Sequence, residues 1–244
     1  MKPFPCNLFM LCVVSVCLLS SCGGDEDDAA DADKGGESPV AHSYVSLDTS
    51  DGVLWATTNL GATRPEEKGG YFAWAETSAK NSYLWDTYRY CDGYDKSLTK
   101  YCAQADYGFE GYTDATPLTE VMPEDDAATQ LWGSSWRMPS REEWENLIDE
   151  CDWSQITLSG TPGFRISSRK HPERSIFLPA AGRMTLSSPY SDGETGYYWT
   201  RTLDTEKPTY AYSFCSRSYR QDYVCLPTLR YIGASVRPVY LPNK

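Results

Sequence analysis

Few residues of this chain could act as general acids, general bases or nucleophiles. Histidine, the usual proton-transfer residue at neutral pH, occurs only as His42 and His171. No HExxH, GxSxG, Walker A or GxGxxG sequence is present, so the common metalloprotease, hydrolase and nucleotide-binding sites are not indicated. The acidic residues 124–126 could bind calcium, but acids at the start of a helix explain them sufficiently. We therefore expect no catalytic residue, no cofactor and no metal.

Side chains suited to binding are concentrated in residues 83–94, YLWDTYRYCDGY, where aromatic and polar residues are interleaved. Aromatic faces beside polar groups can stack on sugar rings or hold a peptide. A second polar and aromatic stretch covers residues 219–223, YRQDY. The alternative is that these rings, above all Trp85 and Tyr90, pack in the core. The candidate ligand-binding residues are Tyr83, Trp85, Tyr88, Tyr94, Tyr219 and Tyr223.

The N-terminal residues have the pattern of a secretory signal peptide. Residues 8–19, LFMLCVVSVCLL, are apolar, follow Lys2, and are too few to span a bilayer. The sequence Leu19-Ser20-Ser21-Cys22 resembles the bacterial lipobox, in which the cysteine becomes the acylated first residue of the mature chain. We therefore predict a lipoprotein signal peptide over residues 1–21 and lipidation, including palmitate, at Cys22, with acyl chains that hold the protein on a membrane.

Residues 22–41 contain GGDEDDAADADKGGESP, which lacks aromatic residues and cannot bury enough surface to fold. We expect an acidic disordered tether. It also resembles the export signal that sends some Bacteroidetes lipoproteins to the cell surface, so we expect an outer-membrane protein exposed to the exterior; a plain periplasmic spacer is the alternative. The formal net charge of −12 argues against nucleic acid as a partner, because nucleic-acid binding needs clustered lysine and arginine.

Residues 42–244 contain no linker-like stretch, and we expect a single domain. Ser140 and Glu143 form a capping box before an apolar face that predicts a helix over residues 141–151. Pro123 and the following acids predict a second helix over residues 123–132. The high tyrosine and tryptophan content, 18 and 8 residues, favours strands elsewhere. The sequence therefore predicts an α+β fold, with short strands at residues 44–47, 53–57, 71–74, 175–178, 197–202, 210–215 and 234–240.

Five cysteines remain after the signal peptide and Cys22 are set aside, and this odd number leaves at least one thiol without an intrachain partner. Cys215 and Cys225 flank a polar stretch that could form a hairpin, so we expect a disulfide bond between them. A pairing of Cys91 with Cys102 or Cys151 is the next alternative.

Several segments, in this order, closely resemble the Fibrobacter succinogenes major paralogous domain of Bacteroidetes lipoproteins. They are VLWATTNLGATRPEEKGGYFAWAET, LTKYC, PEDDAATQLWGSSWRMPSREEWENLIDEC, SIFLPAAG, GYYWTRT and SVRPVY, within residues 44–241. The family is similar to the C-type lectin-like fold, which implies two helices, a small twisted antiparallel sheet and long loops. The EPN, QPD and WND tripeptides of calcium-dependent lectins are missing, so calcium-dependent sugar binding is not implied.

The WRMPSREEW block also has a physical reading of its own. Trp136 and Trp144 lie eight residues apart around Pro139, and we expect them to anchor the core together. Arg137 and Arg237 lie among apolar residues and need an acid or carbonyl partner if buried. The alternative for both arginines is an exposed position that covers apolar surface.

The sequence thus favours a surface-anchored lipoprotein whose domain is a non-catalytic binding module for a glycan or protein ligand. A structural subunit of a surface appendage or envelope complex is the alternative. A hydrolase with an unrecognised site is less favoured.

Overall fold

The computed structural model describes residues 42–218 and 222–242. The chain divides into the units Met1–Ser38 and Pro39–Lys244, and all described residues belong to the second unit. The predicted signal peptide, Cys22, the acidic tether and Tyr219 lie outside the described residues. Within the described ranges, no helix is both long enough and apolar enough to cross a membrane.

The fold is mostly β, and the predicted α+β class with one small twisted sheet is wrong. Strands account for 37% of the structure and helices for 14%, and the described strands form four antiparallel sheets. The four-stranded sheet has the order β1 (Tyr44–Ser46), β2 (Leu54–Ala56), β12 (Val239–Tyr240) and β3 (Trp136–Arg137). One three-stranded sheet has the order β11 (Asp222–Leu229), β10 (Tyr210–Arg217) and β9 (Thr195–Leu203), and the other has the order β4 (Cys151–Leu158), β5 (Thr161–Ser168) and β6 (Ser175–Pro179). The two-stranded sheet pairs β7 (Arg183–Thr185) with β8 (Ser188–Tyr190).

The excess of strand comes largely from a hairpin that the periodicity did not reveal. The strands β4 and β5 each hold eight residues and pair over their whole length around Ser159 and Gly160. Both turn residues have positive φ, 48° and 86°, as a two-residue turn that follows the strand twist requires. At Gly163 a Cβ would lie 2.3 Å from the Leu178 carbonyl oxygen, so only glycine allows β6 to pair there.

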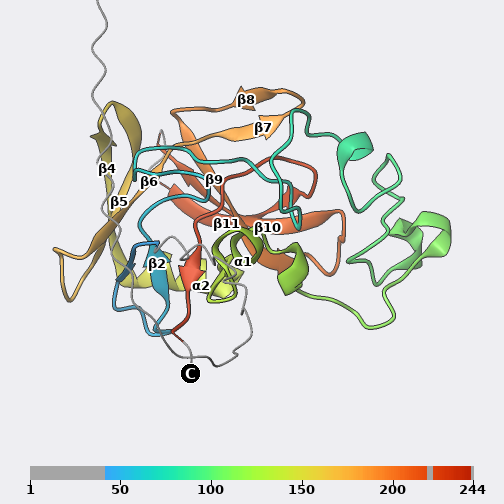
Figure 1. Ribbon diagram of the computed structural model, residues 1–244, viewed down its shortest axis with the longest axis horizontal. Coiled ribbons are helices and arrows are strands. Elements are labelled where there is room, and N and C mark those ends of the chain that lie inside the picture. The colour runs from blue at the N-terminus through green and yellow to red at the C-terminus, as the bar shows by residue number, and fades with distance from the viewer. Residues whose placement is uncertain (1–41, 219–221, 243–244) are drawn as a thin grey trace, which may run out of the picture. The chain divides into compact units, whose positions relative to one another are not determined.

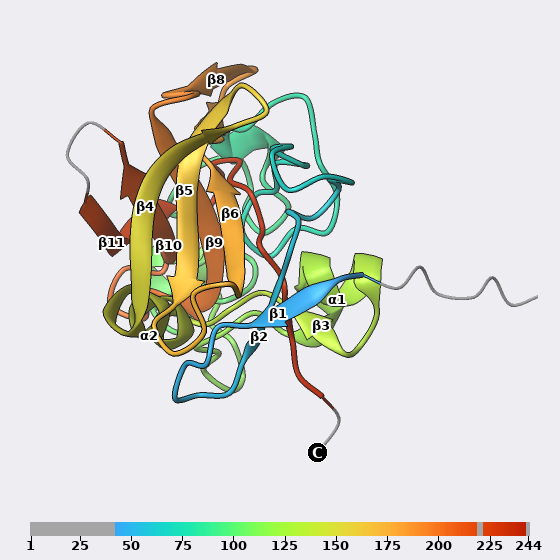
Figure 2. The same cartoon turned by 90° about the vertical axis from the view of Figure 1, so that its left-hand side faces the viewer.

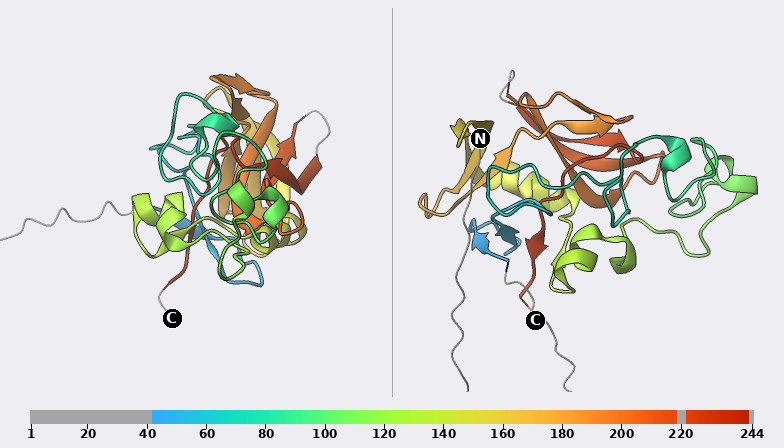
Figure 3. Two further views of the ribbon diagram at one scale, coloured as in Figure 1. Left: turned by 90° about the vertical axis from the view of Figure 1, so that its right-hand side faces the viewer. Right: turned by 45° about the horizontal axis from the view of Figure 1, so that its top comes forward.

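One core lies where the two three-stranded sheets face each other (Figure 2). The ring of Trp144 on α2 (Arg141–Glu150) stacks on Phe214 of β10, with centroids 4.3 Å apart. A second core packs the long loops between β2 and α1 (Ala127–Trp132) against β9. These loops extend away from β4 and β5 (Figures 1 and 3). They contain the 3₁₀ turns η1 (Trp85–Thr87), η2 (Ala105–Tyr107), η3 (Phe109–Gly111) and η4 (Pro123–Asp125).

The capped helix is confirmed, since α2 begins after Ser140 and the Ser140 and Glu143 side chains cap it reciprocally. The other predicted helix begins later than expected. Residues 123–125 form only a 3₁₀ turn, and the Asp126 carboxylate accepts hydrogen bonds from Ala128 and Thr129 as the N-cap of α1. The cap therefore lies inside the acidic run that was expected to be helical.

Both arginines of the resembling segments are paired. The Arg137 guanidinium forms a two-bond ion pair with the Glu143 carboxylate. Arg237 is fully buried and donates to Asn59 Oδ1 and to the carbonyl oxygens of Ala56 and Phe177. Burial lowers the pKa of Arg237 to about 10. The two arginines thus tie chain segments together instead of covering surface.

The two tryptophans are both buried but anchor different parts of the molecule. Trp144 lies between the sheets on Phe214, whereas Trp136 packs on Trp132 and Tyr240. The expectation that they pack together is therefore wrong, since each contacts a different set of rings.

The predicted disulfide bond between Cys215 and Cys225 is wrong. Cys215 lies opposite Val224, and Cys225 lies opposite Phe214, in the register of β10 and β11. Side chains of directly opposed residues share a face and successive residues alternate, so the two thiols point to opposite faces of the sheet. All five cysteines of the described residues are free thiols.

A candidate binding groove

The aromatic residues predicted to form the ligand site mostly face inward. Tyr83 is 1% exposed and donates its hydroxyl hydrogen to the Tyr71 carbonyl. Tyr88 is 2% exposed and donates to the Trp74 carbonyl. No ring face is left for a ligand, so the predicted ligand contacts of Tyr83 and Tyr88 are wrong, and for these two the core alternative holds.

A fully buried arginine organises this core. The Arg230 guanidinium carbon lies 5.0 Å from the Trp74 ring centre and 5.1 Å from the Tyr88 ring centre. Its Nε donates to the Tyr88 hydroxyl oxygen at 2.9 Å. Such cation–π contacts hold a guanidinium among rings without a carboxylate. Its remaining hydrogen bonds go to the carbonyl oxygens of Lys100, Tyr101 and Pro208.

Two of the acidic residues 124–126, Asp125 and Asp126, are buried and serve the fold. The Asp125 carboxylate accepts hydrogen bonds from the hydroxyls of Tyr90 and Tyr101 and from the Lys100 ammonium. Burial raises the pKa of Asp125, but these three donors together outweigh burial, and the pKa lies below its usual value. At the neighbouring N-cap, burial raises the pKa of Asp126. No cluster of three or more metal-ligating side chains occurs in the described part of the chain.

The other predicted ligand residues do not meet at one surface. Trp85 packs edge-on against Tyr231 beside the loop core, with centroids 5.0 Å apart. Tyr223 is half-buried beside the other core and stacks on Trp153 at 4.4 Å. Tyr94 is 55% exposed on its loop. The predicted set is therefore divided among separate contacts.

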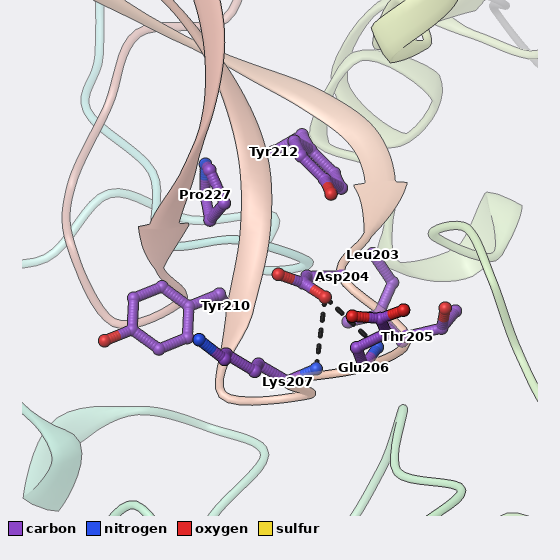
Figure 4. Close-up of a pocket in the computed structure, with 8 residues that line it drawn as sticks. All are labelled: Leu203, Asp204, Thr205, Glu206, Lys207, Tyr210, Tyr212 and Pro227. Carbon is purple, nitrogen blue, oxygen red and sulfur yellow. Dashed lines mark hydrogen bonds between the residues drawn. The ribbon is translucent and has the colours of Figure 1, made fainter.

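A groove of about 480 Å³ lies where β10 and β11 meet the loop after β9 (Figure 4). Tyr210 and Tyr212 are two residues apart on β10, and Pro227 of β11 lies directly opposite Tyr212, so the three rings share one sheet face. All three are at least partly exposed. The groove is lined by Leu203, Asp204, Thr205, Glu206, Lys207, Tyr210, Tyr212 and Pro227.

The loop that forms the other side of the groove is held in place by hydrogen bonds. Asp204 Oδ1 accepts from the backbone N–H groups of Glu206 and Lys207, both at 3.1 Å. From outside the groove, the Gln104 amide donates to the carbonyl oxygens of Thr205 and Glu206 at 2.8 and 3.0 Å. The charged side chains of Glu206 and Lys207 remain exposed at the rim. The groove therefore combines fixed apolar rings with a polar rim whose backbone is already ordered.

Part of this site has a signal in the sequence. A strand was predicted over residues 210–215, and alternation within it places Tyr210 and Tyr212 on one face. The loop residues Asp204 and Glu206 carry no such signal, because only the closure of β9 onto β10 brings them to the tyrosines. No family model, curated protein or solved structure matches this chain.

Proposed function

We propose that the folded domain is a non-catalytic module that binds a glycan in the groove of β10 and β11. The observation that carries this proposal is the shared face of Tyr210, Tyr212 and Pro227 beside the polar loop 203–207. Sugar rings present apolar C–H faces and hydroxyl edges, so they match ring faces flanked by a carboxylate and an ammonium.

The ordered backbone of loop 203–207 lowers the entropic cost of binding a ligand. A ligand that meets a preordered backbone does not lose affinity to loop ordering. Asp204 holds that backbone through two hydrogen bonds, which leaves Glu206 and Lys207 to meet ligand hydroxyls. The acid of the groove that lies deepest, Asp204, is thus engaged in structure, and this favours binding over hydrolysis.

We further propose that the module belongs to an outer-membrane lipoprotein of the Fibrobacter succinogenes major paralogous domain family, exposed at the cell surface. The support is the signal-peptide pattern of residues 1–21, the lipobox ending at Cys22, and the acidic residues 22–41. A glycan-binding domain at the end of such a tether would capture ligands outside the cell.

The mature chain carrying Cys22→Ser can be applied to a glycan array and then titrated with the best ligand. We expect Tyr212→Ala and Tyr210→Ala each to weaken binding about tenfold, equivalent to about 1.4 kcal/mol. Tyr94→Ala, an exposed tyrosine of the loop first predicted to bind, is the control and should leave the affinity within twofold.

Absence of glycan binding at millimolar concentration would contradict the proposed ligand. An equal loss of affinity in Tyr94→Ala and Tyr212→Ala would contradict the groove as the binding site. Cleavage of a bound glycan would contradict a non-catalytic role.

A further inference from the structure

A continuous row of aromatic rings lies at the sheet β1–β2–β12–β3, which is separate from the sheet that holds the groove strands. His42 stacks on Trp132 with centroids 3.7 Å apart, and Trp132 meets Trp136 edge-on at 5.0 Å. Trp136 in turn contacts Tyr240 at 5.2 Å, and Tyr240 stacks on Tyr44 at 4.6 Å. We call these five residues the aromatic face.

Strand register explains why three of the rings gather on one face of a sheet. Tyr240 lies opposite both Leu54 and Trp136, and Tyr44 lies opposite Ala56, so the three aromatic residues share one face of the sheet β1–β2–β12–β3. The alternate positions, with Trp55 and Val239 at 0% exposure, fill the core. Tyr44, on the other face, is 48% exposed, so no other part of the protein covers that face at Tyr44.

The segments that carry the aromatic face contain no aspartate, glutamate, lysine or arginine. These are residues 42–47, 127–136 and 238–242, in a chain whose formal net charge is −12. Burial lowers the pKa of His42, which favours its uncharged form. Leu131 and Leu241, in the same segments, are 54% and 42% exposed. An uncharged surface with large exposed apolar side chains suits a partner whose apolar interior lies beneath a polar surface layer.

The aromatic face is also where the proposed lipid anchor joins the domain. The first described residue, His42, is itself part of the face, and β1 starts beside α1 (Figure 2). Nineteen residues lie between Cys22 and His42, so the chain between them spans at most about 70 Å. An acylated Cys22 therefore keeps this side of the domain within reach of the bilayer and raises its effective concentration there.

We propose that the aromatic face rests on the headgroup region of the bilayer that holds the Cys22 anchor, an inference that depends on the proposed lipoprotein. Tryptophan and tyrosine favour the boundary between headgroups and acyl chains, where one part of the ring system is apolar and the other is hydrated. The missing charges remove the cost of desolvating ions at that boundary. Contact through this face orients the domain relative to the membrane.

The acylated full chain, reconstituted in phosphatidylethanolamine and phosphatidylcholine vesicles with brominated acyl chains, tests this placement by tryptophan fluorescence. We expect bromine quenching in the unsubstituted protein and at least twofold less quenching in Trp132→Phe. The control Trp153→Phe removes a half-buried tryptophan that stacks on Tyr223 and should leave quenching in place.

A charge-insertion pair separates membrane contact from loss of the fold. Tyr44→Lys with Leu131→Lys should abolish quenching, whereas Tyr190→Lys with Leu186→Lys, at 54% and 58% exposure beside the β7–β8 turn, should not. Circular dichroism and thermal melts of both pairs check folding. No quenching in the vesicle-bound acylated chain would overturn the inference. So would a concentration-dependent dimer that Tyr44→Lys with Leu131→Lys dissociates, because the face would then bind a second copy.

The outcomes also distinguish this inference from the proposed function. Quenching without glycan binding removes only the groove proposal, because the groove strands β10 and β11 belong to another sheet. Mass spectrometry that finds no acyl group on the mature chain removes the anchor and this inference with it. Glycan binding by the Cys22→Ser chain would be unaffected.

Discussion

The guanidinium of Arg141, the first residue of α2, lies 4.2 Å from the centre of the Tyr212 ring on β10. The same arginine donates through Nε to Glu145 at 2.6 Å, one turn along the helix. The start of the capped helix therefore braces one ring of the groove, and the ring in turn covers the arginine. This contact links helix α2, which the sequence predicts correctly, to the groove, which it did not predict.

Replacing Arg141 by alanine should weaken glycan binding three- to tenfold, because Tyr212 loses the contact that fixes its ring. Arg141 is 40% exposed at its side chain, so the free energy of unfolding should change by less than about 1 kcal/mol. Calorimetric titration and urea unfolding measure the two effects. Arg64→Ala removes an exposed arginine with its own ion pair and is the matched control. Unchanged binding in Arg141→Ala would show that Tyr212 needs no brace.

Glu143→Gln should destabilise the fold by about 3 kcal/mol in urea unfolding. The Glu143 carboxylate accepts hydrogen bonds from Arg137 and from the Ser140 backbone N–H, so the change leaves a largely buried arginine without its charge partner. Glu142→Gln alters the neighbouring exposed acid in the same helical turn and should change stability by less than about 0.5 kcal/mol. Equal effects of the two substitutions would contradict the assigned role.

The parts of the fold that the sequence predicts are those fixed by neighbours along the chain. Ser140 and Glu143 cap α2 within four residues, so the pattern suffices. Tyr88, in contrast, is buried by Arg230, which follows 142 residues later. Composition cannot separate a stacking platform from a core when the deciding contact is this remote. A short strand such as β3, two residues long, exists only because β12 pairs with it.

Cysteine pairing fails for a related reason, because a shift of one residue in register decides which face a thiol occupies. We expect thiol reagents to label Cys91, Cys102, Cys151, Cys215 and Cys225 in the unfolded, unreduced mature chain. In the native state at pH 8, labelling of all five should be slow, because burial raises the pKa of every one of these thiols, that of Cys151 to about 11 and that of Cys225 to about 12. Mass spectrometry after alkylation counts the labels. Three labels in place of five would indicate a disulfide bond.

Asp125→Asn should lower stability at pH 7 by about 2 kcal/mol, because the Lys100 ammonium and two tyrosine hydroxyls lose a buried charged acceptor. The folded-state pKa of Asp125 lies below the usual value of 3.8. Its contribution is therefore present above pH 3.8 and is lost as the pH falls through the lower folded-state pKa. The difference in unfolding free energy between the two proteins should be largest near neutrality and shrink below pH 3.8.

Removing one donor at a time tests the cause of that pH dependence. Tyr90→Phe deletes one hydrogen bond to the Asp125 carboxylate, which should move the folded-state pKa of Asp125 upward. The stability that the carboxylate contributes should therefore be smaller than in the unsubstituted protein, and its loss on acidification should be complete at a higher pH. Tyr112→Phe is the matched control, because its hydroxyl donates to Asp114 on the exposed loop and does not contact Asp125. Urea unfolding between pH 2.5 and 7 measures all three curves. If Tyr90→Phe and Tyr112→Phe give the same profile, the low pKa of Asp125 does not depend on the Tyr90 hydroxyl and must come from Lys100 and Tyr101.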